Sequence, residues 1–172
     1  MKKRITSLAV AVFLVFAGPA SAQLWVGANL TSPTSDFGDI ADTGWMGNVG
    51  YLIPLGEGGL GFAPEVYYGS NGHSDSDDKT NLYGANANLG FSFGTGNVMP
   101  FIFGSVGILA HQFSPDEGDG ETETGISFGA GGGLDFGRFG VEGKFLTAST
   151  GEDGADATTA VLIFGAFVKI GG

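Results

Sequence analysis

Strict alternation between apolar and small or polar residues, repeated along the chain, is the feature that most constrains how this sequence can fold. From Tyr83 to Phe93 every odd-numbered residue is Tyr, Ala, Leu or Phe, and every even-numbered residue is Gly, Asn or Ser. The stretch from Gly125 to Phe136 shows the same alternation. A period of two places alternate side chains on opposite faces of a strand, and no window after residue 22 has a convincing helical period. The sequence therefore predicts an all-β fold.

Eight such segments can be marked, and the links between them have a pattern of their own. The predicted strands cover residues 24–32, 43–54, 60–70, 80–94, 98–113, 122–136, 139–150 and 158–170. Three links are tight, and the four others are longer and polar; the tight ones are 55–59, 95–97 and 137–138. Short and long links that alternate along the chain indicate an antiparallel up-and-down arrangement with all the short turns at one end.

The first 22 residues have the composition of a bacterial export signal. Three basic residues at positions 2–4 precede the apolar run Ile5–Ala17, and the small residues Ala20-Ser21-Ala22 provide a cleavage site. The apolar run is short for a transmembrane helix, which needs about 20 residues. We therefore expect a cleaved signal peptide at 1–22 and one β-barrel domain at 23–172.

Acidic residues dominate the charge, with 18 Asp and Glu against 7 Lys and Arg in the whole chain. Removal of residues 1–22 would leave four basic residues and a net charge of 4 − 18 = −14. This excess argues against nucleic acid as a partner. The chain has no cysteine, which excludes disulfides, thiolate metal sites and cysteine nucleophiles.

Fourteen of the 18 acids lie in or beside the four long links. They are Asp36, Asp39, Asp42, Asp75, Asp77, Asp78, Asp116, Glu117, Asp119, Glu121, Glu123, Glu152, Asp153 and Asp156. A soluble barrel exposes charge on its outer face, whereas a membrane barrel turns an apolar face to lipid, where a charge at the midplane costs about 2–4 kcal/mol. Because one face of the predicted strands is nearly uncharged and rich in aromatic residues, we predict an eight-stranded antiparallel up-and-down transmembrane β-barrel.

A transmembrane barrel behind an export signal indicates the bacterial outer membrane, since a closed sheet pairs every backbone group in lipid. An even number of strands places both termini and the short turns on the periplasmic side and the acidic links outside. Outer-membrane lipids are the expected partners, and the domain is expected to be a monomer.

Several segments give the chain a resemblance to a known family. They are Pro64–Gly69, Pro100–Gly107 and Gly129–Phe136. Together with the export signal, the eight strands and the alternating links, they make residues 23–172 similar to the small eight-stranded outer-membrane barrels of the outer-membrane protein A and X type. The resemblance implies the fold of these porin-like proteins. For the function we expect a non-enzymatic role in envelope structure or surface interaction.

Charged and amide side chains inside the predicted strands fall on the polar, glycine-rich parity, which faces the barrel interior. They are Glu65, Asn86, Asn88, Asp135, Glu142 and Lys144. An eight-stranded barrel is just wide enough to be filled by its own side chains, and buried charges must be paired. We therefore predict a structural network in the lumen. A narrow channel that moves protons or ions along the network is the alternative.

A second alternative, a lipid-modifying barrel enzyme, depends on the two histidines, His73 and His111. A nucleophilic mechanism needs one of them within hydrogen-bond reach of a hydroxyl. Ser105 shares the parity of His111 but is six residues away, about 20 Å along a strand. Ser92 and Ser127 would have to approach across strands. We predict no catalytic residues.

A calcium site is the remaining candidate, because Ser74–Asp78 offers oxygen ligands of the kind that calcium prefers. The segment lacks the glycine and the terminal glutamate of a calcium loop. We expect no bound metal and no cofactor, and at most a weak association of divalent cations with the acidic links.

Overall fold

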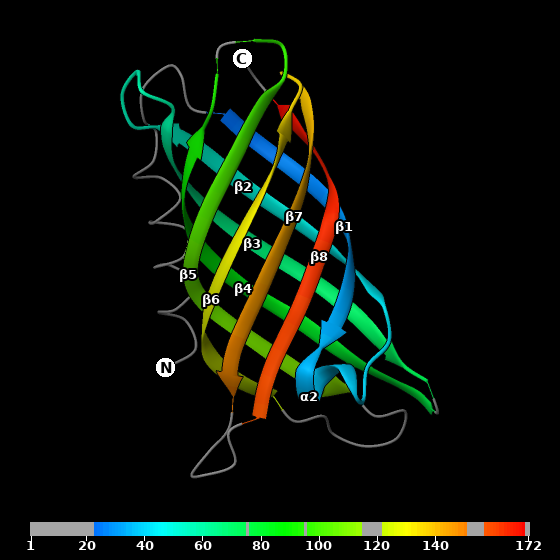
Figure 1. Cartoon of the computed structure of the whole chain (residues 1–172). Helices are drawn as coiled ribbons and strands as arrows, with labels where there is room; N and C mark the ends of the chain where they lie inside the picture. The colour runs from blue at the N-terminus through cyan, green and yellow to red at the C-terminus, as the bar shows by residue number, and fades with distance from the viewer. Residues whose placement is uncertain (1–22, 75, 95, 115–121, 151–156, 171–172) are drawn as a thin grey trace, which may run out of the picture.

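The alternating segments form eight antiparallel strands that close into a barrel (Figure 1). The computed structural model describes residues 23–74, 76–94, 96–114, 122–150 and 157–170, so the predicted signal peptide at 1–22 lies outside the described residues. The strands are β1 (Gln23–Thr34), β2 (Gly44–Pro54), β3 (Leu60–His73), β4 (Ser76–Ser92), β5 (Met99–Ser114), β6 (Thr122–Asp135), β7 (Phe139–Thr150) and β8 (Ala157–Ile170). The predicted fold class is confirmed.

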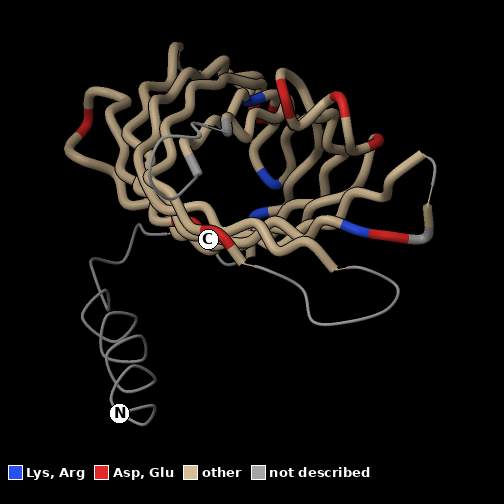
Figure 2. Tube along the Cα trace, turned by 90° about the horizontal axis from the view of Figure 1, so that it is seen from below, with Lys and Arg blue, Asp and Glu red and all other residues tan. Residues whose placement is uncertain are grey.

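Pairing between the first and last strands closes the sheet. Leu24 of β1 lies opposite Ile170 of β8, and Thr34 lies opposite Ala160. Seen end on, the strands form a complete ring (Figure 2). Closure leaves no unpaired strand edge, which is the requirement for a sheet surrounded by lipid. Among the described residues no helix is long and apolar enough to cross a membrane, since α2 (Ser35–Gly38) has four residues.

Glycines in the left-handed backbone region make the short turns possible. Gly56 and Gly59 lie between β2 and β3, Gly94 between β4 and β5, and Gly137 between β6 and β7, with φ between 82° and 91°. A side chain with a Cβ rarely adopts this conformation. We call this end of the barrel the turn end, and the opposite end, where β1 leads into α2, the loop end.

The link between the third and fourth strands differs from the prediction. Residues 71–79 were expected to form a long polar link, but β3 continues to His73 and β4 begins at Ser76. Asn71 pairs with Thr80 and Gly72 with Lys79, so the polar residues extend the ladder as a hairpin. The polar composition of this segment is typical of a solvent-exposed loop. Here Asn71 and Thr80 are buried inside the barrel mouth.

The outer face of the barrel is an apolar band with aromatic residues at both ends. Leu30, Ile102 and Ile126 are each more than half exposed. At the loop end Trp45 contacts Tyr68, and at the turn end Phe91 contacts Phe93 and Phe136 contacts Phe139, with ring centroids 5.0–5.9 Å apart. An apolar band flanked by aromatic girdles is typical of membrane barrels.

Candidate functional site in the barrel interior

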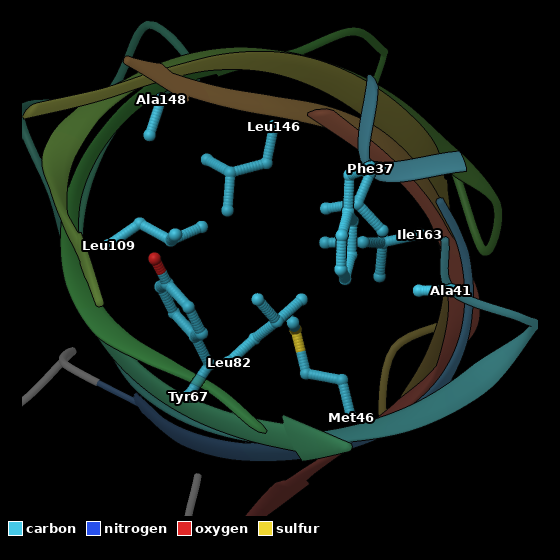
Figure 3. Close-up of a cluster of buried hydrophobic side chains, with 10 residues drawn as sticks. Phe37, Ala41, Met46, Tyr67, Leu82, Leu109, Leu146, Ala148 and Ile163 are labelled. Carbon is cyan, nitrogen blue, oxygen red and sulfur yellow. The ribbon is translucent and has the colours of Figure 1, made fainter. Parts of the chain in front are cut away.

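The interior is built in three layers, and the layer at the loop end is apolar. Its side chains point toward one another across the barrel (Figure 3). They are Phe37, Ala41, Met46, Tyr67, Leu82, Leu109, Leu146, Ala148, Val161 and Ile163. Phe37 comes from α2, so the first link folds back into the barrel mouth and completes the layer. The alternation of residues predicted a polar lumen and did not predict this apolar layer.

The middle layer is a polar network around Glu65, whose side chain is only 2% exposed. Lys144 forms an ion pair with its Oε1. The amide of Asn48 donates to the same oxygen over 2.7 Å, and the amide of Asn88 donates to Oε2 over 3.0 Å. The ammonium of Lys144 also lies 5.9 Å from the centre of the Tyr67 ring. Both charges are therefore paired and hydrogen-bonded, as burial requires.

Glu142 lies beside this network with fewer partners. Its Oε1 accepts a hydrogen bond of 3.4 Å from Asn48, which is long for an N–H to oxygen bond. The nearby ammonium of Lys144 is already bonded to Glu65. Within the part of the chain that the structure describes, no ion pair to Glu142 is found. The middle layer therefore carries one carboxyl group in excess of its cations.

The structure brings four of the six predicted network residues together: Glu65, Asn88, Glu142 and Lys144. The other two face the same interior but have separate partners. Asn86 accepts a hydrogen bond of 3.1 Å from Ser127. Asp135, close to the turn end, forms an ion pair with Lys169 and accepts a bond of 2.8 Å from the backbone of Gly137.

Three polar residues that take part in these interior contacts were not predicted: Asn29, Asn48 and Lys169. Asn29 donates to Asn48 over 3.1 Å and so joins the network. Its position on the same parity as the buried Gly27 and Thr31 was the signal that could have identified it. Lys169 shares the inward parity of Phe167 but was assigned only to the end of its strand.

The layer at the turn end combines aromatic rings with glycines. Each inward aromatic side chain lies opposite a glycine of the neighbouring strand: Trp25 opposite Gly50, Phe101 opposite Gly133, Phe103 opposite Gly131 and Phe167 opposite Gly140. A Cβ at any of these glycines would overlap the facing ring. Glycine thus makes the space that the rings occupy. The rings leave a cavity of about 270 Å³ between them and the polar network.

His111 lies at the loop end between a hydroxyl group and a carboxylate. Its Nδ1 is 3.0 Å from Thr159 Oγ1, and its Nε2 is 3.3 Å from Glu123 Oε2. This order of groups resembles a catalytic triad. Thr159 is only 4% exposed, however, and it pairs with Ala148 within the strand ladder. Backbone N–H groups held in a ladder are not available as an oxyanion hole.

The candidate calcium segment Ser74–Asp78 and the acidic links are only partly covered by the described residues. Ser76 donates to the carboxylate of Asp78 over 2.8 Å, while Asp75 lies outside the described part. Among the described side chains no group of three or more His, Asp or Glu is placed to hold a metal ion. The links at 115–121 and 151–156, which carry many of the predicted acids, also lie outside the described residues.

Comparison with solved structures identifies the fold. Neisserial surface protein A superimposes with a TM-score of 0.62 at 16% identity, over 87% of this chain and 97% of that protein. Ail of Yersinia pestis, solved with the heparin analogue sucrose octasulfate, gives 0.60 at 15% identity over 87% and 97%. The N-terminal barrel domain of Pseudomonas aeruginosa OprF gives 0.57 at 16% identity over 86% and 97%.

No protein-family model and no curated protein sequence matches the chain. At a sequence identity of 15–16%, the similarity shows a shared fold and does not show a shared function. The resemblance stated from the sequence is confirmed at that level: the chain has the fold of the small eight-stranded outer-membrane barrels.

Proposed function

We propose that this protein is a monomeric, non-enzymatic barrel of the bacterial outer membrane that serves envelope structure or surface interaction. The observation that carries the proposal is the distribution of polarity across the barrel wall. Leu30 and Ile126 are 64% and 62% exposed on the outer face, whereas the ion pair of Glu65 and Lys144 is buried inside. An exposed apolar band of this kind is rare on a soluble monomer and suits lipid.

Filling of the interior supports a structural role rather than a channel. Leu82, Leu109 and Ile163 are fully buried in the apolar layer, and Phe37 covers the layer from the loop end. An ion that crossed this layer would lose its hydration without gaining ligands. In planar lipid bilayers we expect no steady single-channel current from the native protein. Discrete conductance steps that scale with protein concentration would favour the narrow channel instead.

The enzymatic alternative depends on His111, whose imidazole lies between Thr159 and Glu123. Burial of Thr159 and the engagement of strand N–H groups in the ladder support the non-enzymatic proposal. Cells that express the native protein and the His111→Ala variant are expected to have identical outer-membrane lipid profiles by mass spectrometry. A lipid species that depends on His111 would contradict the proposal.

Surface interaction is proposed to involve cations. Asp36, Asp39 and Asp42 are exposed at the loop end, the end at which β5 and β7 also finish. Such a rim attracts divalent or polycationic partners through a field that salt screens over about 8–10 Å. The Ail structure contains a polysulfated heparin analogue, and an acidic rim would repel such a ligand. Calcium titrations are expected to show weak binding that falls between low and moderate salt; salt-independent binding would contradict the electrostatic account.

A further inference from the structure

The cavity at the turn end has walls of a distinct chemistry. Trp25, Phe101, Phe103 and Phe167 contribute aromatic rings, with neighbouring centroids 6.0–6.2 Å apart. Gly56 and Gly59 of the first short turn also line it, so the cavity reaches the turn end of the barrel. Its volume of about 270 Å³ is close to the lower limit of small-molecule sites.

The inner end of the same cavity has more hydrogen-bond acceptors than donors. The carboxyl group of Glu142 lines it and receives only the long hydrogen bond from Asn48 among the described contacts. Asn88 lines it as well, and both described bonds of its amide nitrogen go to Ala63 and Glu65. Its amide oxygen is buried and has no hydrogen-bond partner among the described residues.

The cations of the interior do not balance this excess. Lys144 is bonded to Glu65, and Lys169, which lines the cavity, is bonded to Asp135. Among the described interior carboxyl groups, Glu142 is the one for which no ion pair is found. A buried carboxylate needs a cation or a proton. Aromatic faces attract cations, and the attraction is stronger where water is excluded.

We propose that this cavity binds a small organic monocation: a primary ammonium group with an apolar body. The ammonium would donate to the Glu142 carboxylate, and the body would lie among the four rings. A simple acyl chain fits the apolar walls but supplies no cation to Glu142. A simple metal cation would pair with Glu142 but would not fill the apolar space between the rings.

The two tryptophans of the chain allow a direct test. Trp25 lines the cavity, whereas Trp45 lies on the outer face and is 54% exposed. The indole N–H signals are followed by NMR in phosphatidylcholine nanodiscs during titration with 2-phenylethylammonium. The neutral 2-phenylethanol and the anionic phenylacetate serve as probes of matched shape. We expect a saturable shift at Trp25 alone, with the ammonium binding at least tenfold more tightly than the alcohol and phenylacetate more weakly than both.

Glu142→Gln removes the charge and keeps the shape, so the ammonium should then bind no better than the alcohol. Glu123→Gln, at the opposite end of the interior, is the matched control and should retain the preference. Ala63→Leu, which fills the cavity, should abolish binding of both probes. Heat-modifiable gel migration shows whether Glu142→Gln folds. If it does not fold, two measurements still test the proposal: the relative affinities of the probes for the native protein, and the loss of binding in Ala63→Leu. Equal affinity of the native protein for the ammonium and the alcohol would overturn the proposal. Parallel shifts of the Trp25 and Trp45 signals that do not saturate would also overturn it.

Discussion

At the scale of single residues, the barrel interior depends on pairs of very large and very small side chains. The ring of Trp25 occupies the space above Gly50, and Phe167 occupies the space above Gly140. A barrel of eight strands has room for few side chains per layer, so a large ring needs an absent Cβ opposite it. The high glycine content, 33 residues in the chain, is therefore partly a packing requirement.

Gly50→Ala tests this pairing, with Gly47→Ala on the same strand as its control. A methyl group at Gly50 would meet the Trp25 indole, whereas at Gly47 the nearest atom is 4.0 Å away. Overpacking of this kind typically costs about 1–3 kcal/mol. We expect Gly50→Ala to lower the free energy of unfolding by that amount and Gly47→Ala to leave it nearly unchanged in urea titrations. Equal midpoints would show that the indole moves aside freely.

The ion pair of the middle layer makes a second prediction at this scale. Lys144→Met leaves the Glu65 carboxylate buried without its cation, which should cost about 3–5 kcal/mol. Lys79→Met removes an exposed lysine at the loop end and should cost at most about 1 kcal/mol. Urea unfolding in lipid vesicles measures both. If the two variants unfold at the same denaturant concentration, the pair contributes nothing to stability.

At the scale of elements, the first link is part of the core and not a dispensable surface loop. Ser35 has a φ of +55°, which turns the chain inward at the end of β1 and starts α2. Asn71 on β3 holds the link by donating to the backbone oxygen of Asp42 over 2.7 Å and to Thr31 Oγ1 over 2.9 Å. These contacts place Phe37 inside the barrel mouth, where it is 5% exposed.

Phe37→Ala should therefore destabilise the barrel by about 3–5 kcal/mol, the usual cost of truncating a buried phenylalanine. Ile40→Ala, in the same link but 57% exposed, is the control and should have little effect. The unfolding temperatures of the two variants are compared by heating each protein and monitoring its gel migration. If Phe37→Ala does not change the unfolding temperature, the link covers the barrel mouth without contributing to the packing of the interior.

The elements also show how far the sequence alone could lead. Alternation predicted all eight strands and placed Glu65, Glu142 and Lys144 on the inward face, because a period of two fixes the facing of every residue in a strand. It did not predict the apolar layer, since Leu82 and Leu109 lie on the polar parity and only the closed barrel brings them together. Pairs such as Phe101 with Gly133 depend on strand register, which no local pattern specifies.

At the scale of the whole molecule, the positions of the glutamates provide a test of orientation. Glu57 lies in a turn at the turn end, whereas Glu117, Glu121 and Glu152 belong to the long links of the sequence. A glutamate-specific protease added to intact cells should cut the long links and leave the bond after Glu57 uncut. Disrupted cells, where both ends are accessible, are the control. Cleavage after Glu57 in intact cells would reverse the proposed orientation.

The pairing of β1 with β8 has a consequence for the time course of assembly. Leu24 and Ile170, which lie opposite each other, are 170 − 24 = 146 positions apart in the chain. The contact that completes the barrel therefore joins the first strand to be synthesised with the last. Contacts between such distant residues are slow to form, and until then β1 keeps one unpaired edge that is open to aggregation. We therefore expect the chain to need protection from aggregation until β8 has been made, and a fragment that lacks β8 to leave β1 with an open edge.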